Sequence, residues 1–213
     1  MRVERATVAE LVDSDQWAEL SEIIACIDTE VAAVTAAAVD PEAARCKALA
    51  QRLQDALLAC MAIRDLPPQR PSSLRRVSVH AAGDAAPPCL DGACSIVGCL
   101  GNRLVGHRLI LPHHKTARSR GVMQLDVPAD SATATLLEHH LGWGRALLLG
   151  DAPLPCPALF LSQHGVAYTV EAFRARISAS LTRYGLSARI THTKVWAQAH
   201  STHTWRIARR APA

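Results

Sequence analysis

Aromatic residues are scarce in this chain. Two Phe, two Tyr and four Trp make up 4% of its 213 residues, so the core has to be built mainly from Ala, Leu and Val within an apolar content of 49%. No apolar run reaches the roughly 20 residues of a membrane-crossing helix, and we expect no membrane partner. The length suits one domain, or a small helical segment followed by a larger core.

Features of secreted proteins are also missing. The seven cysteines are odd in number and lack the even spacing of a disulfide framework. The stretch from Met1 to Arg5 leads into an acidic segment rather than the hydrophobic stretch of a signal peptide. We therefore expect an intracellular, reducing location, nuclear or cytoplasmic, and no secretion.

Two common catalytic motifs are absent as well. No Gly-x-Ser-x-Gly nucleophile elbow occurs, which argues against a Ser/His/Asp hydrolase. No P-loop occurs, which argues against nucleotide hydrolysis.

Acidic residues are missing from long parts of the chain. The formal charge is −6 over residues 1–65 (six basic, twelve acidic), +3 over 66–151 (nine, six) and +7 over 152–213 (eight, one). No acid lies between Cys94 and Leu125. A basic last two-thirds indicates a polyanionic partner, and the alternative is an Arg-rich composition without such a partner.

Apolar periodicity predicts a mainly helical α+β fold, with a β-hairpin or small three-stranded sheet. The first predicted helix spans 8–39. A second begins at Asp40-Pro41-Glu42, where Asp can cap, Pro suits the first helical position and Glu suits the positive end of the dipole. It ends before Pro67. Its apolar face consists of Leu49, Leu53, Leu57, Cys60 and Met61.

The later part of the chain alternates between strand and helix patterns. Residues 108–112 and 122–127 are predicted to pair as strands. A helix from Asp130, ending near Gly142-Trp143-Gly144, has an apolar face made of Leu136, Leu137 and Leu141. A helix starting near Thr169 has a basic face, solvated or near DNA, that carries Arg174, Arg176 and Arg183; its apolar face consists of Val170, Phe173, Ile177, Leu181 and Tyr184.

Four basic positions are the candidate site: Arg70, Lys115, His203 and Arg206. Arg70 follows a Pro-rich turn, Lys115 lies in the basic connection between the two predicted strands, and the last two form a His-x-x-Arg motif. An arginine binds a phosphate through two parallel hydrogen bonds, and a lysine with a tuned pKa can protonate a leaving oxygen. Positive charge placed in advance stabilises a phosphorane transition state.

This order of residues resembles the catalytic core of tyrosine recombinases, the phage-integrase family. Pro67-Pro68-Gln69-Arg70 and His113-His114-Lys115-Thr116 are similar to the versions in a divergent branch of eukaryotic mobile elements, and Leu159-Phe160-Leu161-Ser162 is similar to another family segment. The resemblance implies that Arg70, Lys115, His203 and Arg206 are the catalytic residues. It implies DNA recombination and integration as the activity, double-stranded DNA as the partner and a homo-oligomer on DNA.

Neighbouring basic residues are candidate DNA contacts: Arg75, Arg76, His114, Arg118 and Arg120. Arg75 and Arg76 form either such contacts or ordinary salt bridges. The alternative for Arg70 is a surface arginine in a Pro-rich turn. The alternative for Lys115 is phosphate binding without catalysis.

The family's nucleophilic tyrosine has no counterpart here. The only tyrosines are Tyr168 and Tyr184, and both precede His203. We therefore expect a catalytically incomplete chain: an acidic helical segment over 1–40, then a recombinase-like core over 41–213 with an incomplete C-terminus. The alternatives are a non-catalytic DNA-binding remnant of a mobile element and a small helical protein-interaction module.

Residues 78–103 are predicted to be an insertion loop with Cys89, Cys94 and Cys99 evenly spaced. The family chemistry requires no cofactor, but these cysteines could hold a structural zinc ion. A fourth ligand would be needed, with His80, His107 and Cys156 as candidates. The alternative is that the cysteines are free or packed.

Overall fold

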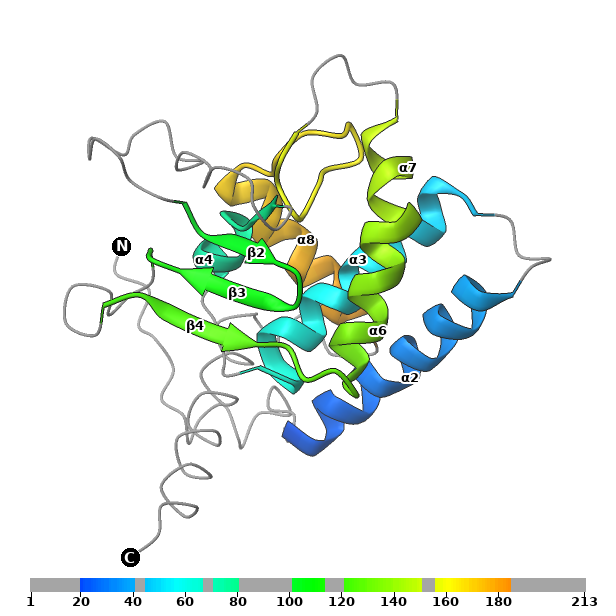
Figure 1. The fold of residues 1–213 in the computed structure, drawn as a ribbon. Coiled ribbons are helices and arrows are strands. Elements are labelled where there is room, and N and C mark those ends of the chain that lie inside the picture. The colour runs from blue at the N-terminus through cyan, green and yellow to red at the C-terminus, as the bar shows by residue number, and fades with distance from the viewer. Residues whose placement is uncertain are drawn as a thin grey trace, which may run out of the picture.

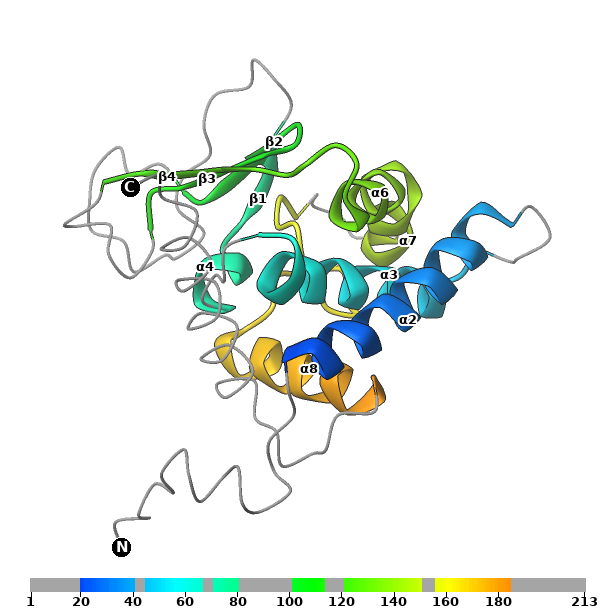
Figure 2. The same cartoon turned by 90° about the horizontal axis from the view of Figure 1, so that it is seen from below.

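Helix α3 (Lys47–Ala59) lies at the centre of the fold, and the other elements pack around it (Figures 1 and 2). The structure, a computed structural model, describes residues 20–40, 45–66, 71–80, 101–113, 121–150 and 156–184. α3 is in contact with α2 (Leu20–Val39), α6 (Ala132–His139), α7 (Arg145–Leu149) and α8 (Val170–Arg183). Nine of its thirteen residues are buried, as expected for a helix that is covered on several sides.

A four-stranded mixed sheet lies beside these helices (Figure 2). Strands β1 (Ser78–His80) and β2 (Arg103–Val105) pair in parallel, while β2, β3 (Arg108–Leu111) and β4 (Met123–Asp126) are antiparallel. On the other side of β1, an isolated antiparallel bridge joins Ser78 to Ala158. This mainly helical α+β architecture confirms the predicted fold class.

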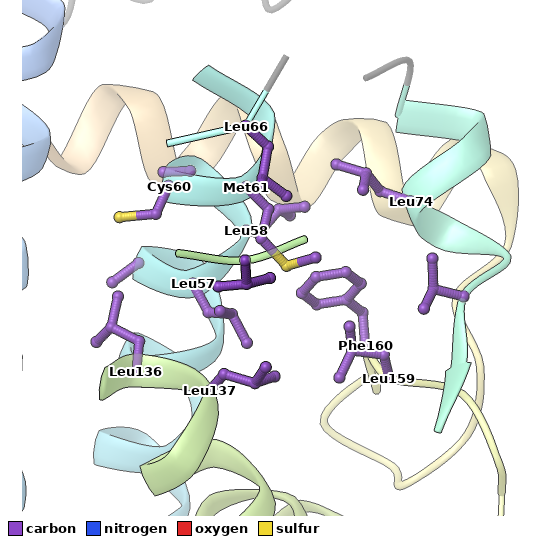
Figure 3. Packing of buried hydrophobic residues seen from close by; sticks show 14 of the residues in the cluster. Leu57, Leu58, Cys60, Met61, Leu66, Leu74, Leu136, Leu137, Leu159 and Phe160 are labelled. Atoms are coloured by element: carbon purple, nitrogen blue, oxygen red, sulfur yellow. The ribbon is translucent and has the colours of Figure 1, made fainter. Parts of the chain in front are cut away.

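One hydrophobic cluster connects the helices with the sheet (Figure 3). Leu57 of α3, Leu137 of α6 and Leu74 of the short helix α4 (Pro71–Arg75) are fully buried in it. Phe160 adds a ring that lies 5.9 Å, between centroids, from the ring of Phe173 in α8. The apolar face predicted for the second helix is confirmed, since Leu49, Leu53, Leu57, Cys60 and Met61 are each at most 8% exposed.

The sheet is larger than the sequence predicted. Strand β1 and the first residue of β2, Arg103, fall within 78–103, the segment predicted to be an insertion loop, so the two ends of this segment are sheet rather than loop. Each strand has only three residues, too few to give a recognisable alternation of apolar and polar side chains. The strand pair predicted over 108–112 and 122–127 is confirmed as β3 and β4.

The predicted start of the second helix was wrong. The backbone amide of Asp40 donates to Ala36 O (3.1 Å), so Asp40 is still bonded to the last turn of α2. Cys46 has extended backbone angles, and α3 begins at Lys47. Part of the intervening sequence, 41–44, lies outside the described residues.

The end of the third predicted helix was also wrong. Ser131, not Asp130, is its N-cap, and the helix continues from α6 through a π-helical turn, η2 (His140–Gly144), into α7. A Cβ on Gly144 would lie 3.0 Å from Leu53 Cδ2. The glycine that reads as a stop signal therefore permits close packing on α3. The wider turn shifts the helical register, and Leu141 is 36% exposed.

The helix predicted from Thr169 is confirmed. The Thr169 side chain accepts a hydrogen bond from Ala172 N (3.1 Å), and α8 follows. Among the described residues, no helix combines the length and the apolar character needed to cross a membrane.

Candidate nucleic-acid interface

The four residues predicted to hold a phosphate, Arg70, Lys115, His203 and Arg206, lie outside the described residues. So do the predicted DNA contacts His114, Arg118 and Arg120, and the predicted zinc ligands Cys89, Cys94 and Cys99. The segments on both sides of Arg70 and the segment before Lys115 are described. The structure therefore shows how these segments are held.

Asn102 joins the segment after Arg70 to the segment before Lys115. Its Nδ2 donates to Ser73 O (2.9 Å) in α4 and to His113 O (3.1 Å) just beyond β3. Its Oδ1 accepts from His113 N (2.9 Å). The residue is 1% exposed, so these bonds are shielded from water. The two segments are thus fixed against each other by a single side chain.

The segment before Arg70 is also anchored. α3 ends in a π-helical turn, η1 (Cys60–Arg64), followed by Asp65 and the buried Leu66. The carboxylate of Asp65 accepts hydrogen bonds from Thr133 N (2.9 Å) and Thr133 Oγ1 (2.7 Å) at the start of α6. A carboxylate at this position stabilises the positive end of the helix dipole. The chain therefore leaves α3 toward Arg70 from a fixed position.

Arg75 takes part in the fold itself. It is half-buried, and its Nη1 donates to Tyr168 O (3.1 Å), directly before the N-cap of α8. Arg76 is also half-buried. Arg75 therefore links α4 to the start of α8, and its contact with DNA stays a prediction, as does that of Arg76.

The two tyrosines are core residues. Tyr168 is 8% exposed and Tyr184 is 7% exposed, and burial raises the pKa of both phenols. Tyr168 Oη accepts a hydrogen bond from Gln51 Nε2 (3.4 Å). A phenol that is buried and held protonated is a poor nucleophile.

The basic face of α8 differs from its prediction at Arg176. Two guanidinium nitrogens of Arg176 donate to the carboxylate of Asp55 (2.7 and 2.6 Å), and Arg183 adds a third bond (2.9 Å). Burial lowers the pKa of Arg176, but the hydrogen bonds and charge of Asp55 outweigh it and the net pKa is raised. Arg176 is therefore a partner of a buried carboxylate and is only partly exposed to solvent. Arg174 is exposed, as predicted.

Two of the candidate zinc ligands, His80 and Cys156, lie in segments that are bonded to each other. Both ring nitrogens of His80 are buried and have no hydrogen-bond partner among the residues that the structure describes. A bridge joins Ser78 to Ala158, and Val79 N donates to Pro157 O (2.8 Å) between these two segments. His107 lies in the exposed turn between β2 and β3. The described ranges contain no group of three or more metal-ligating side chains.

Known proteins give no further guide to this site. No profile of a known protein family matches the chain, and no curated protein or solved structure is significantly similar to it.

Proposed function

We propose that this chain binds the phosphate backbone of double-stranded DNA through Arg70, Lys115, His203 and Arg206. The observation that carries the proposal is the hydrogen bonding of Asn102, which ties together the segments that flank Arg70 and Lys115. Arg70 and Lys115 are 45 residues apart in the sequence. A single buried amide that bridges their flanks supports a common site for both.

The charge distribution supports the same partner. The last 62 residues carry eight basic side chains and one acidic one, Glu171. Neutralising phosphates with Lys and Arg releases counterions from DNA, which makes such binding strong at low salt and weak at high salt. A nuclear location and a homo-oligomer on DNA are parts of this proposal.

The proposal is DNA binding and not strand cleavage by either tyrosine of this chain. Tyr168 and Tyr184 are buried, and the pKa of each is raised. A recombinase-type reaction would need a tyrosine nucleophile at the phosphate. The four basic residues would then hold the phosphate and stabilise its charge.

A titration of a 20-bp duplex, followed by fluorescence anisotropy at several salt concentrations, tests the proposal. We expect measurable binding at low salt, and we expect Arg70→Ala and Arg206→Ala each to reduce the magnitude of the log–log salt slope by about one. Arg52→Ala is the control. It also removes one positive charge, but Arg52 lies on α3, where it pairs with Glu30 of α2, and is not one of the four proposed phosphate ligands. No binding at low salt, or the same effect from all three substitutions, would contradict the proposal.

We also propose that Cys89, Cys94 and Cys99 hold a structural zinc ion, with His80 as the fourth ligand. A neutral histidine nitrogen is a zinc donor, and both ring nitrogens of His80 are buried without a hydrogen-bond partner in the described part of the chain. Elemental analysis of the purified protein tests this. About one zinc ion per chain, lost in Cys94→Ala and reduced in His80→Ala, is the expected result; a metal-free protein that is folded would contradict it.

A further inference from the structure

Arginines and carboxylates form a charged cluster where α3 packs on α2 and α8 (Figure 2). Arg52 of α3 pairs with Glu30 of α2. Arg176 and Arg183 of α8 share the single carboxylate of Asp55. These five side chains carry three positive and two negative charges, so the cluster has a surplus of one positive charge. A surplus of this kind attracts an anion.

The surplus charge belongs to Arg183. Arg52 and Arg176 each bind their carboxylate through Nε and Nη2, the two donors along one edge of the guanidinium group. Arg183 bonds to Asp55 through Nη1 (2.9 Å), and among the described residues no acceptor bonds to its Nε or Nη2. Its side chain is 37% exposed. Arg183 therefore keeps available the edge with which the other two arginines hold an oxyanion.

Tyr184, the residue that follows, adds a second unused donor. It is 7% exposed, and its buried Oη has no hydrogen-bond partner in the described ranges. Burial raises the pKa of this phenol, the charges of Asp55 and Glu30 raise the pKa further, and the charge of Arg183 lowers it. The hydroxyl therefore stays protonated and lies close to the charged cluster. A buried O–H group without an acceptor destabilises a fold, and an oxyanion would supply the acceptor.

We infer that Arg183 and Tyr184 bind a small free oxyanion, of which inorganic phosphate is the simplest example. Nε and Nη2 of Arg183 donate to it, and Tyr184 Oη donates the third hydrogen bond. A small ion reaches this hydroxyl through a shift of the partly exposed Arg183 side chain. The phosphates of DNA are a poor fit, because they are fixed along a stiff duplex and Tyr184 Oη is buried. The site is separate from the proposed DNA-binding residues.

A titration with inorganic phosphate tests the inference. The phosphorus resonance of phosphate gives its affinity for the full chain, at an ionic strength held constant with sodium chloride. We expect saturable binding to the wild type. We expect Tyr184→Phe to weaken it by about tenfold, as for the loss of one hydrogen bond to a charged group, and Arg183→Gln to weaken it by about tenfold or more.

Arg174→Gln and Tyr168→Phe are the matched controls. Arg174 is an exposed arginine of the same helix, and the hydroxyl of Tyr168 already has a partner in Gln51. Both substitutions should leave the affinity for phosphate unchanged. Without phosphate, Tyr184→Phe should melt at or above the wild-type temperature, because it removes a buried O–H group that lacks an acceptor. Tyr168→Phe should melt below it.

Three results would overturn the inference. The first is no saturation in the wild type, or the same affinity in every variant, since phosphate also stabilises proteins by its exclusion from their surface. The second is a Tyr184→Phe protein that binds phosphate as the wild type does and melts lower without it, which would give the hydroxyl a structural role only. The third is a loss of duplex affinity in Arg183→Gln with unchanged phosphate binding, which would assign Arg183 to the DNA backbone.

The DNA proposal and this inference fail separately. A chain that binds phosphate as expected and binds no duplex would contradict the DNA proposal alone. If Arg183→Gln does not fold, Tyr184→Phe still decides the outcome, because the phenyl ring keeps the packing of the buried side chain.

Discussion

At the scale of single residues, Asp55 is the charged side chain buried most deeply in the described core. Its carboxylate is 1% exposed and accepts three hydrogen bonds from Arg176 and Arg183, which remain 26% and 37% exposed. A buried carboxylate without its partners is strongly unfavourable, and both arginines would lose these hydrogen bonds. Asp55 thereby locks α3 to α8.

Asp55→Asn tests this role. The neutral amide keeps the shape but removes the charge, and it presents donors to the two guanidinium groups. We expect a loss of about 2–3 kcal/mol in unfolding free energy, below the cost for a fully buried pair because both arginines reach solvent. Urea unfolding followed by circular dichroism measures it. Glu30→Gln, which breaks the more exposed pair with Arg52, should cost less than about 1 kcal/mol; equal losses would contradict the interpretation.

His140 is a second buried titratable residue. It is 0% exposed, its Nε2 donates to Leu159 O (2.9 Å), and Nδ1 has no hydrogen-bond partner. Burial lowers its pKa to about 4. Between about pH 6.5 and pH 4, the unfolded chain therefore binds a proton at His140 and the folded protein does not. The free energy of unfolding must decrease as the pH is lowered through this range.

The pH dependence of unfolding tests the neutral state of His140. Between about pH 6.5 and pH 4, the wild type should lose about 3 kcal/mol more than His140→Gln, since a fall in the pKa of His140 from 6.5 to about 4 corresponds to this amount. The glutamine keeps a donor toward Leu159 O, and the carboxylates titrate in both proteins. Parallel stability curves for the two proteins would show that His140 is not held neutral.

At the scale of elements, one turn is fitted tightly against the end of α7. Gly165 has a φ of +73°, and a Cβ there would lie 2.7 Å from Leu149 O. Gly106, in the turn between β2 and β3, has a φ of +55° but open space around a Cβ. The positive φ angle disfavours an L residue at both positions. Of the two, only Gly165 would also bring a Cβ into collision with the backbone of Leu149.

Gly165→Ala and Gly106→Ala separate these two effects. Gly106→Ala should cost about 1–2 kcal/mol of unfolding free energy, the cost of the left-handed backbone alone. Gly165→Ala should cost clearly more, because the turn and α7 have to move apart. Thermal unfolding of both variants gives the comparison, and similar costs would mean that the turn moves without resistance.

The approximate positions of the helices could be predicted from local apolar periodicity. The buried polar contacts and the π-helical turns could not, because they depend on tertiary packing. The apolar face that runs from Leu49 in α3 to Met61 in η1 is visible in the sequence because one side of a helix recurs every 3.6 residues. The burial of Asp55 in the same helix is not, since Arg176 lies 121 residues away. The π-helical turns escaped prediction for the same reason: Gly144 serves packing against Leu53, while the sequence alone suggests a helix end.

The candidate site was predicted only by residue type and order. The sequence proposed Arg70 and Lys115 as partners through a family resemblance, and both lie outside the described residues. It gave no role to Asn102, the side chain that links their flanks. An asparagine between a glycine and a short strand resembles any turn residue, and only its three hydrogen bonds distinguish it.

At the scale of the whole molecule, the described part of the chain shares one main core. Ile23, Ile27 and Val34 of α2 are at most 1% exposed and belong to the same cluster as Leu104 and Leu109 of the sheet. The acidic N-terminal segment predicted over 1–40 is thus attached to the core through α2. A helix that shares a core with the rest of the fold should unfold together with it.

Ile27→Ala tests this cooperativity. The lost side chain should lower the unfolding free energy by about 2–4 kcal/mol, because Ile27 is fully buried. Native-state hydrogen exchange, resolved by peptide in increasing urea, should show the same loss of protection in α2, β3 and α8. A loss confined to α2 would mean that this helix opens by itself and that the predicted boundary at residue 40 separates two independent units. A uniform loss would mean that α2 stabilises the same cooperative unit as the Asn102 hydrogen bonds, so substitutions in α2 would also affect the stability of the proposed DNA-binding site.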